Sequence, residues 1–314
     1  MSTIINNHRV GDTQIHVDVG DYTVSDILTL TEPSGDIELS LAAKVGTCAF
    51  ITRKITGIKS NSVTSIGQSA FYGCSKLTYA SFRNVTSISS SAFQNCSSLA
   101  TVYFPKATFI GSSAFQSCSS LVSCSFPKVT TIGDSSFCSC ISLSEVNFDN
   151  VVTISANAFK GCTSLLNFSA SKATTIGNTS FNGCSSLITA AFPKLTTMGG
   201  GTTFNGCGSL QTLDLGVTGR LMGTNQFSGN NGMLSTLILR KSNGVATMDG
   251  VGFFNYTAFA SNGSGGTIYI PEVMYNHLND NTGYDYMKVT NWIAVYSYGN
   301  LTWSKIEGSA YDYD

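Results

Sequence analysis

Cysteine is the residue with reactive chemistry that recurs most regularly in this sequence. Seven cysteines stand 22 or 23 residues apart: Cys74, Cys96, Cys118, Cys140, Cys162, Cys184 and Cys207. Such a column could form a ladder of disulfides or a metal site, because stacked equivalent positions lie about 5 Å apart. However, stacked side chains point in parallel, and Cys138-Ser139-Cys140 is a weak metal pattern. The sequence therefore favours buried thiols that act as small apolar side chains, with no metal or cofactor.

Side chains suited to catalysis are sparse. The outward acids on the expected strands are Glu145, Asp149 and Asp214. The first two would lie about 13 Å apart on one extended strand, which is too far for the usual carboxylate pair of a glycosidase. Gly-x-Ser-x-Gly, His-Glu-x-x-His and phosphate-loop motifs are absent, and the histidines form no spaced cluster: His8, His16 and His277. We therefore predict that the protein is not an enzyme.

A repeat of 22 residues must position these side chains. Segments similar to Ile-Gly-x-Ser-Ala-Phe begin at Ile66, Ile88, Ile110, Ile132, Ile154, Ile176 and Met198. The spacing Leu99-Val102-Phe104, repeated in the other units, is typical of leucine-rich repeats. Strand alternation places Val102 and Phe104 inward and Tyr103 outward. One repeat is too small to bury its own apolar face, so the sequence predicts a β-rich leucine-rich-repeat solenoid of parallel stacked strands.

Two details of the repeat concern its packing. A glycine column is expected at a turn that favours positive φ: Gly67, Gly111, Gly133, Gly177 and Gly199. In one repeat, Ala170 replaces the phenylalanine at the strand end, and Phe168 replaces the small residue two positions earlier. Because this swap roughly conserves volume, we interpret it as compensation within the core.

The repeats define three predicted regions. Residues 1–43 form a small non-repeat β region for attachment, residues 44–264 form the solenoid, and residues 265–314 form a C-terminal cap. The cap contains an aromatic cluster that would cover the last repeat: Tyr284, Tyr286, Trp292, Tyr296, Tyr298 and Trp303. No apolar run is long enough to insert into a membrane, and we find no secretory signal pattern.

Two rows on the predicted surface are candidate binding sites. The strand face offers side chains that suit sugars or protein surfaces: Tyr79, Thr101, Tyr103, Ser123, Ser125, Asn147, Asn167 and Thr189. The second row follows the strand ends at intervals of 22 residues and would attract an anionic partner: Asn84, Lys106, Lys128, Asn150, Lys172 and Lys194. The alternatives are an ordinary solvated strand face and a Pro-Lys turn copied by duplication. The formal net charge of -1 gives no overall attraction to nucleic acid.

The repeat that runs from Ile66 to Leu77 resembles the BspA-like leucine-rich repeats, and the resemblance covers about residues 58 to 240. The resemblance implies a solenoid used for adhesion and host recognition, without catalytic residues. Such proteins occur on bacterial surfaces and are also encoded by phages. We expect a phage tail or baseplate appendage on the virion that binds a host-surface glycan or protein and contacts neighbouring subunits. A bacterial surface adhesin is the alternative, a polysaccharide-degrading tailspike is a remote one, and a homo-oligomer remains open.

Overall fold

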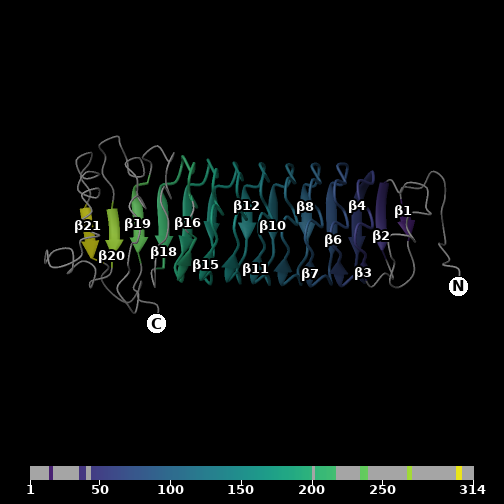
Figure 1. The fold of residues 1–314 in the computed structure, drawn as a ribbon, viewed down its shortest axis with the longest axis horizontal. Helices are drawn as coiled ribbons and strands as arrows, with labels where there is room; N and C mark the ends of the chain where they lie inside the picture. Colours follow the sequence, from purple (N-terminus) through teal and green to yellow (C-terminus); the bar gives the residue numbers. More distant parts are fainter. Residues whose placement is uncertain are drawn as a thin grey trace. The chain divides into compact units, whose positions relative to one another are not determined.

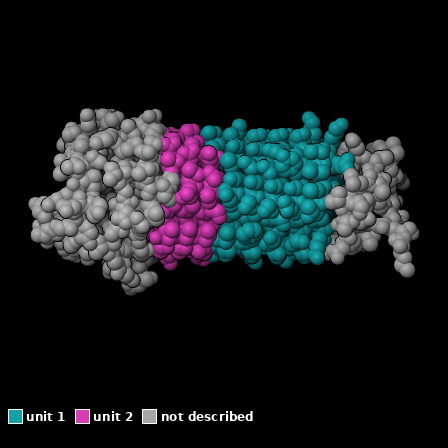
Figure 2. All heavy atoms as spheres, viewed as in Figure 1, with its two compact units in different colours: residues 1–151, 161–163 teal, residues 152–160, 164–314 magenta. Residues whose placement is uncertain are grey.

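The structure is a computed structural model that describes residues 14–16, 35–39, 44–199, 202–216, 234–239, 267–270 and 302–305. The chain divides into two compact units (Figure 2). Unit 1 comprises residues 1–151 and 161–163, and unit 2 comprises residues 152–160 and 164–314. Every regular element in the described residues is a β-strand.

Unit 1 contains parallel strands that lie on two sides of its turns (Figure 1). The first side carries β1 (Gln14–His16), β2 (Gly35–Leu39), β4 (Ile55–Ser60), β6 (Tyr79–Phe82), β8 (Thr101–Tyr103), β10 (Ser123–Ser125) and β12 (Glu145–Asn147). The second side carries β3 (Lys44–Val45), β5 (Ser65–Ile66), β7 (Ser87–Ile88), β9 (Phe109–Ile110) and β11 (Thr131–Ile132). Tyr79 is paired with Thr101, and Ser81 with Tyr103. The register is therefore one repeat per turn.

Unit 2 has the same construction. One side carries β14 (Asn167–Ser169), β16 (Thr189–Phe192), β18 (Thr212–Leu215), β19 (Thr236–Leu239), β20 (Thr267–Ile270) and β21 (Thr302–Lys305), all parallel. The other carries β13 (Thr153–Ile154), β15 (Thr175–Ile176) and β17 (Thr197–Met198). These strands confirm the predicted solenoid. Trp303 belongs to β21, and the other residues of the predicted aromatic cluster lie outside the described residues.

Two ladders of phenylalanine rings fill the core of unit 1. Consecutive rings of the first ladder stack with centroids 4.9 to 5.3 Å apart: Phe50, Phe71, Phe93, Phe115 and Phe137. The second ladder stacks at 5.6 to 6.0 Å: Phe82, Phe104, Phe126 and Phe148. Rings of the two ladders meet at a steep angle, as where Phe93 contacts Phe104 at 5.8 Å and 62°. Each ring is thus held both along and across the stack.

In unit 2, Phe168 has the packing role that the sequence indicated. Its ring stacks on Phe192 at 5.6 Å and contacts Phe159 and Phe181 edge-on at 5.0 and 4.8 Å. Ala170, at the usual phenylalanine position, is also buried. The swap therefore keeps an aromatic ring beside Phe192, which confirms compensation within the core.

The expectation of positive φ for the glycine column is wrong. The residues with positive φ lie two places after that column, at Ser69 and its equivalents, and two places after the phenylalanine, at Gly73 and its equivalents. The column is instead required by the close approach of neighbouring turns. A Cβ on Gly133 would lie 2.6 Å from the carbonyl carbon of Gly111 and 2.7 Å from the carbonyl oxygen of Ile110.

Candidate functional site

The outer face of the strands in unit 1 is open to solvent. On β8, β10 and β12 the outward side chains are exposed: Thr101, Tyr103, Ser123, Ser125, Glu145 and Asn147. Strand register places Ser123 beside Glu145 and Ser125 beside Asn147. Tyr103 is 51% exposed although it is a large aromatic residue. The structure thus brings the predicted candidates Tyr103 and Asn147 onto one polar strand face.

Tyr79 occupies the same face in a different way. Its ring lies against Gly57, where any side chain on the glycine would overlap it. Burial, and then the charge and hydrogen bond of Asp36, raise the pKa of the Tyr79 hydroxyl. Thr56 Oγ1 also donates to Asp36 Oδ1, at 2.7 Å. Tyr79 is therefore anchored to its neighbours, whereas Tyr103 stands free of the surface.

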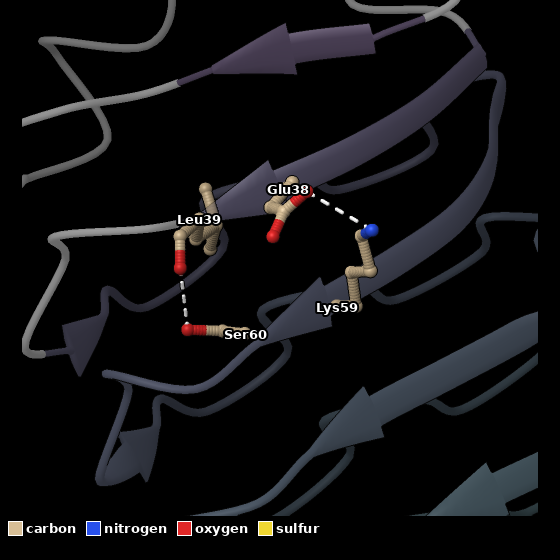
Figure 3. A network of polar contacts seen from close by, with 4 residues as sticks. All are labelled: Glu38, Leu39, Lys59 and Ser60. Carbon is tan, nitrogen blue, oxygen red and sulfur yellow. Dashed lines mark hydrogen bonds and ion pairs between the residues drawn. The ribbon is translucent and has the colours of Figure 1, made fainter.

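The structure adds charged residues on this face that our choice of candidates omitted. Lys59 Nζ lies 3.0 Å from Glu38 Oε2 on the adjacent strand (Figure 3). Its hydrogen bond and ion pair with Glu38 raise the pKa of Lys59. Below this pair, Ser60 Oγ donates to the carbonyl oxygen of Leu39 at 2.6 Å. The alternation Asp36-Ile37-Glu38-Leu39 was the sequence signal that both acids face outward.

The lysine row follows the strands at a turn of the solenoid. In unit 1, Lys106 and Lys128 are exposed, and Lys106 Nζ donates to Asn84 Oδ1 of the preceding turn at 2.7 Å. Asn150 Nδ2 donates to the carbonyl oxygen of Pro127 at 2.6 Å. Both bonds link neighbouring turns, and the Lys106 and Lys128 side chains remain exposed. In unit 2, Lys172 and Lys194 are likewise exposed.

The strand face of unit 2 carries further predicted candidates, Asn167 and Thr189. Asn167 is exposed, and its Oδ1 accepts a hydrogen bond from Thr189 Oγ1 at 2.7 Å. Asp214 was expected to point outward, but it is only 8% exposed. Strand register still pairs Asp214 with Ala191 and Ile238, as an outward position requires, although Leu213, Asp214 and Leu215 are all buried.

The comparisons with known proteins agree with the repeat architecture. The model of the BspA type leucine rich repeat region (6 copies) matches residues 43–167, 108–235 and 152–260. The chain belongs to the BspA-type leucine-rich repeat family. BspA-like proteins are typically surface-exposed, and leucine-rich repeat proteins are generally non-enzymatic binding proteins.

Several solved structures resemble this BspA-type chain. One is a leucine rich cell surface protein from Faecalibacterium prausnitzii, with 21% identity over 74% of this chain and 77% of that chain and a TM-score of 0.44. Another is the leucine-rich repeat protein of T. pallidum, with 27% identity, 58% and 86% coverage and a TM-score of 0.45. A third, from Bacteroides ovatus, has 18% identity, 97% and 99% coverage and a TM-score of 0.39. No curated protein sequence matches the chain.

The cysteine column of this BspA-type chain is buried in both units, as the sequence indicated. Each thiol also donates a hydrogen bond to a phenylalanine carbonyl oxygen of the preceding turn, as Cys118 does to Phe93 at 3.1 Å. The other bonds of this kind span 2.8 to 3.2 Å and start from Cys74, Cys96, Cys140, Cys162, Cys184 and Cys207. The cysteines therefore have two roles: they pack as small apolar side chains, and they act as weak hydrogen-bond donors to carbonyl oxygens of the turns.

We predict that the column thiols react slowly in the native protein. Burial raises the pKa of Cys74 to about 12 and that of Cys118 well above its usual value, so little thiolate forms at pH 8. Iodoacetamide labelling followed by mass spectrometry should modify the partly exposed Cys48 and Cys138 first. The column should react only after denaturation. Disulfides between consecutive column cysteines in non-reducing peptide maps would contradict the prediction.

Metal binding and membrane insertion are two further roles that a surface can serve. In the described residues, no group of three or more histidine, cysteine, aspartate or glutamate side chains could hold a metal ion. The same part of the chain contains no helix that is long and apolar enough to span a membrane.

Proposed function

We propose that this chain is a non-catalytic recognition protein displayed on a bacterial surface, and that the strand face of unit 1 binds its ligand. The observation that carries the proposal is the run of exposed polar side chains between Thr101 and Asn147, set around an exposed tyrosine. Membership of the BspA-type family, whose proteins are typically surface-exposed, supports the location. Adhesion to a glycan or a protein is the activity that fits both.

The face is suited to recognition because its backbone is already ordered. Parallel hydrogen bonds hold the strands on one side of each turn, and the phenylalanine ladders hold them from within. A ligand that binds there therefore costs little conformational entropy of the protein. Tyrosine contributes a large contact area with few rotatable bonds, and the serines and asparagine contribute hydrogen bonds. Tyr103 is thus the expected centre of the contact.

Replacement of Tyr103 by alanine tests the proposal. We expect Tyr103→Ala to weaken binding about tenfold, because an aromatic side chain at the centre of an interface contributes about 1–2 kcal/mol or more. Binding of fluorescent protein to intact host cells, and to arrays of glycans and extracellular-matrix proteins, gives the measurement. The melting temperature should stay the same, since the side chain is half in solvent.

Phe109→Ala is the matched control for this experiment. Phe109 is 43% exposed and follows Tyr103 by six residues, but it belongs to β9 on the other side of the solenoid. This control should retain full binding. If both variants lose binding equally, or if neither does, the strand face is not the binding surface.

A phage virion is the alternative location for the same recognition activity. We retain it as a proposal because the sequence resemblance extends to phage-encoded repeats. Antibody labelling separates the two locations: the adhesin labels the outer surface of intact bacteria, whereas the appendage co-purifies with virions. Detection in the bacterial cytosol alone would contradict both.

A further inference from the structure

The charge of the chain is distributed unevenly along the sequence. Residues 44–199 contain eleven lysines and arginines but only three acids, a formal charge of +8. Residues 1–43 contain one arginine and seven acids, a charge of -6, and residues 200–314 contain five basic and eight acidic residues, a charge of -3. The total of -1 therefore conceals a basic segment that coincides with most of the repeats. A segment of this charge attracts anionic ligands at ordinary ionic strength.

The cations of unit 1 lie at defined places on its turns. Lys54 and Lys76 are exposed before strands β4 and β6, and Lys106 and Lys128 are exposed after strands β8 and β10. Each pair is separated by one repeat of 22 residues, so its members occupy successive turns. In the described part of the chain, neither Lys106 nor Lys128 forms an ion pair with a carboxylate. Lys106 Nζ donates to Asn84 Oδ1, and both ammonium groups retain N–H donors for a ligand.

The pair that follows the strands borders the candidate strand face. Tyr103 precedes Lys106 by three residues, and Ser125 precedes Lys128 by the same interval. At no more than about 3.5 Å per residue, each lysine backbone lies within about 11 Å of the outward residue that precedes it. Lys106 is further oriented by its hydrogen bond to Asn84. An aromatic ring, hydroxyl and amide groups and two lysines thus occur along one edge of successive turns.

We propose that this edge of unit 1 binds a linear acidic polysaccharide, with the chain of sugars running along the stack of turns. The inference rests on the proposed recognition function and names its ligand class. The ring of Tyr103 would contact the apolar face of a sugar, and Ser125 and Asn147 would bind its hydroxyl groups. Lys106 and Lys128 would bind acidic groups on neighbouring sugars. Because successive turns lie about 4.8 Å apart, a polymer with regularly spaced acidic groups matches a row of cations.

The composition of the edge favours a polysaccharide over a nucleic acid. Proteins that bind single-stranded nucleic acid stack several successive bases on aromatic side chains. Here the outward positions equivalent to Tyr103 on the next two turns are Ser125 and Asn147, so one aromatic ring is followed by hydrogen-bonding groups. Alternating apolar and hydroxyl surfaces are the features of a sugar chain.

The test compares two double variants of the full chain that remove the same charge. Lys106→Gln with Lys128→Gln removes the proposed contacts, and Lys54→Gln with Lys76→Gln removes two other exposed lysines, which precede the strands. The probe is polygalacturonate, with neutral dextran of equal length and duplex DNA as references, in biolayer interferometry at several salt concentrations. We expect the first variant to bind polygalacturonate about fivefold or more weakly, and the second to change it less than twofold. Binding of the wild type should decrease with salt.

Each other outcome overturns the inference. Equal losses in both variants show that only total charge matters, and equal affinity for DNA shows a general polyanion surface. A salt-sensitive dimer that excludes polygalacturonate shows that the edge binds an acidic surface of a second copy. If polygalacturonate does not bind while Tyr103→Ala still weakens binding to cells, the acidic ligand is wrong and the recognition function stands.

Discussion

Phe115→Ala is expected to destabilise the protein by about 3–5 kcal/mol, the usual cost of removing a buried phenylalanine. The Phe115 ring is fully buried and stacks between Phe93 and Phe137, with both centroid distances 5.3 Å. It also contacts Phe104 and Phe126 of the second ladder at 6.2 and 5.8 Å. Alanine would therefore leave a cavity that borders four aromatic rings. Urea denaturation followed by circular dichroism measures the change in unfolding free energy.

Phe109→Ala provides the control within the same repeat. Its ring is half in solvent, so its removal should cost about 0.5 kcal/mol or less. Since a solenoid is stabilised by contacts between neighbouring turns, the loss at Phe115 should also appear as faster hydrogen exchange in the adjacent turns. A loss below about 1 kcal/mol for Phe115→Ala would mean that the ladders contribute little to stability.

The core was predictable because its residues recur in register. The columns of isoleucine, phenylalanine and leucine, together with strand alternation, are sufficient to place the buried side chains. The packing of the irregular repeat was also predictable, because the large Phe168 and the small Ala170 together conserve the side-chain volume of the usual pair. The structure retains an aromatic ring beside Phe192. Periodicity was sufficient here because one repeat makes one turn of the solenoid.

Features that depend on contacts between turns were not predictable in the same way. The sequence shows that a glycine or cysteine recurs, but the reason lies in the preceding turn. Gly133 faces the backbone of residues 110–112, and Cys118 donates to the carbonyl oxygen of Phe93. Both partners are backbone atoms, so the contact cannot be recognised from the types of the residues that provide them. The low exposure of Asp214 was not predictable either, because strand alternation gives the side of the strand on which a residue lies but not its exposure.

The candidate binding surface was only partly predictable. Tyr79 and Tyr103 are outward aromatic residues on neighbouring strands, yet Tyr79 is held by Asp36 and lies against Gly57. Strand register separates them, since Gly57 is the residue paired with Tyr79 whereas Tyr103 is paired with Ser81. Because Gly57 has no side chain, the Tyr79 ring can pack against its backbone, whereas Ser81 has a side chain beside Tyr103. Residue type alone therefore did not distinguish how the two tyrosines are packed.

Gly133→Ala is expected to destabilise unit 1 by about 2–3 kcal/mol, although the change adds a single methyl group. The new Cβ would lie 2.6 Å from the carbonyl carbon of Gly111 and 2.7 Å from Ser112 N, and these backbone atoms cannot rotate away. The two turns must therefore separate, which strains the hydrogen bond from Gly133 N to the carbonyl oxygen of Ile110, now 2.8 Å long. Thermal and urea denaturation measure the loss.

Gly161→Asn is the matched control, because it tests the other kind of glycine in the repeat. Gly161 has a φ of +73°, and the nearest atoms to an added Cβ are 3.8 Å away, at ordinary contact distance. Asn95 adopts the same conformation at the equivalent position with a φ of 62°, so asparagine should cost less than about 1 kcal/mol. If Gly161→Asn proved the more damaging change, backbone conformation rather than the spacing of turns would be the stronger constraint on the repeat. The expected order is the reverse, because a left-handed residue can be accommodated within one turn, whereas a methyl group between two turns displaces both.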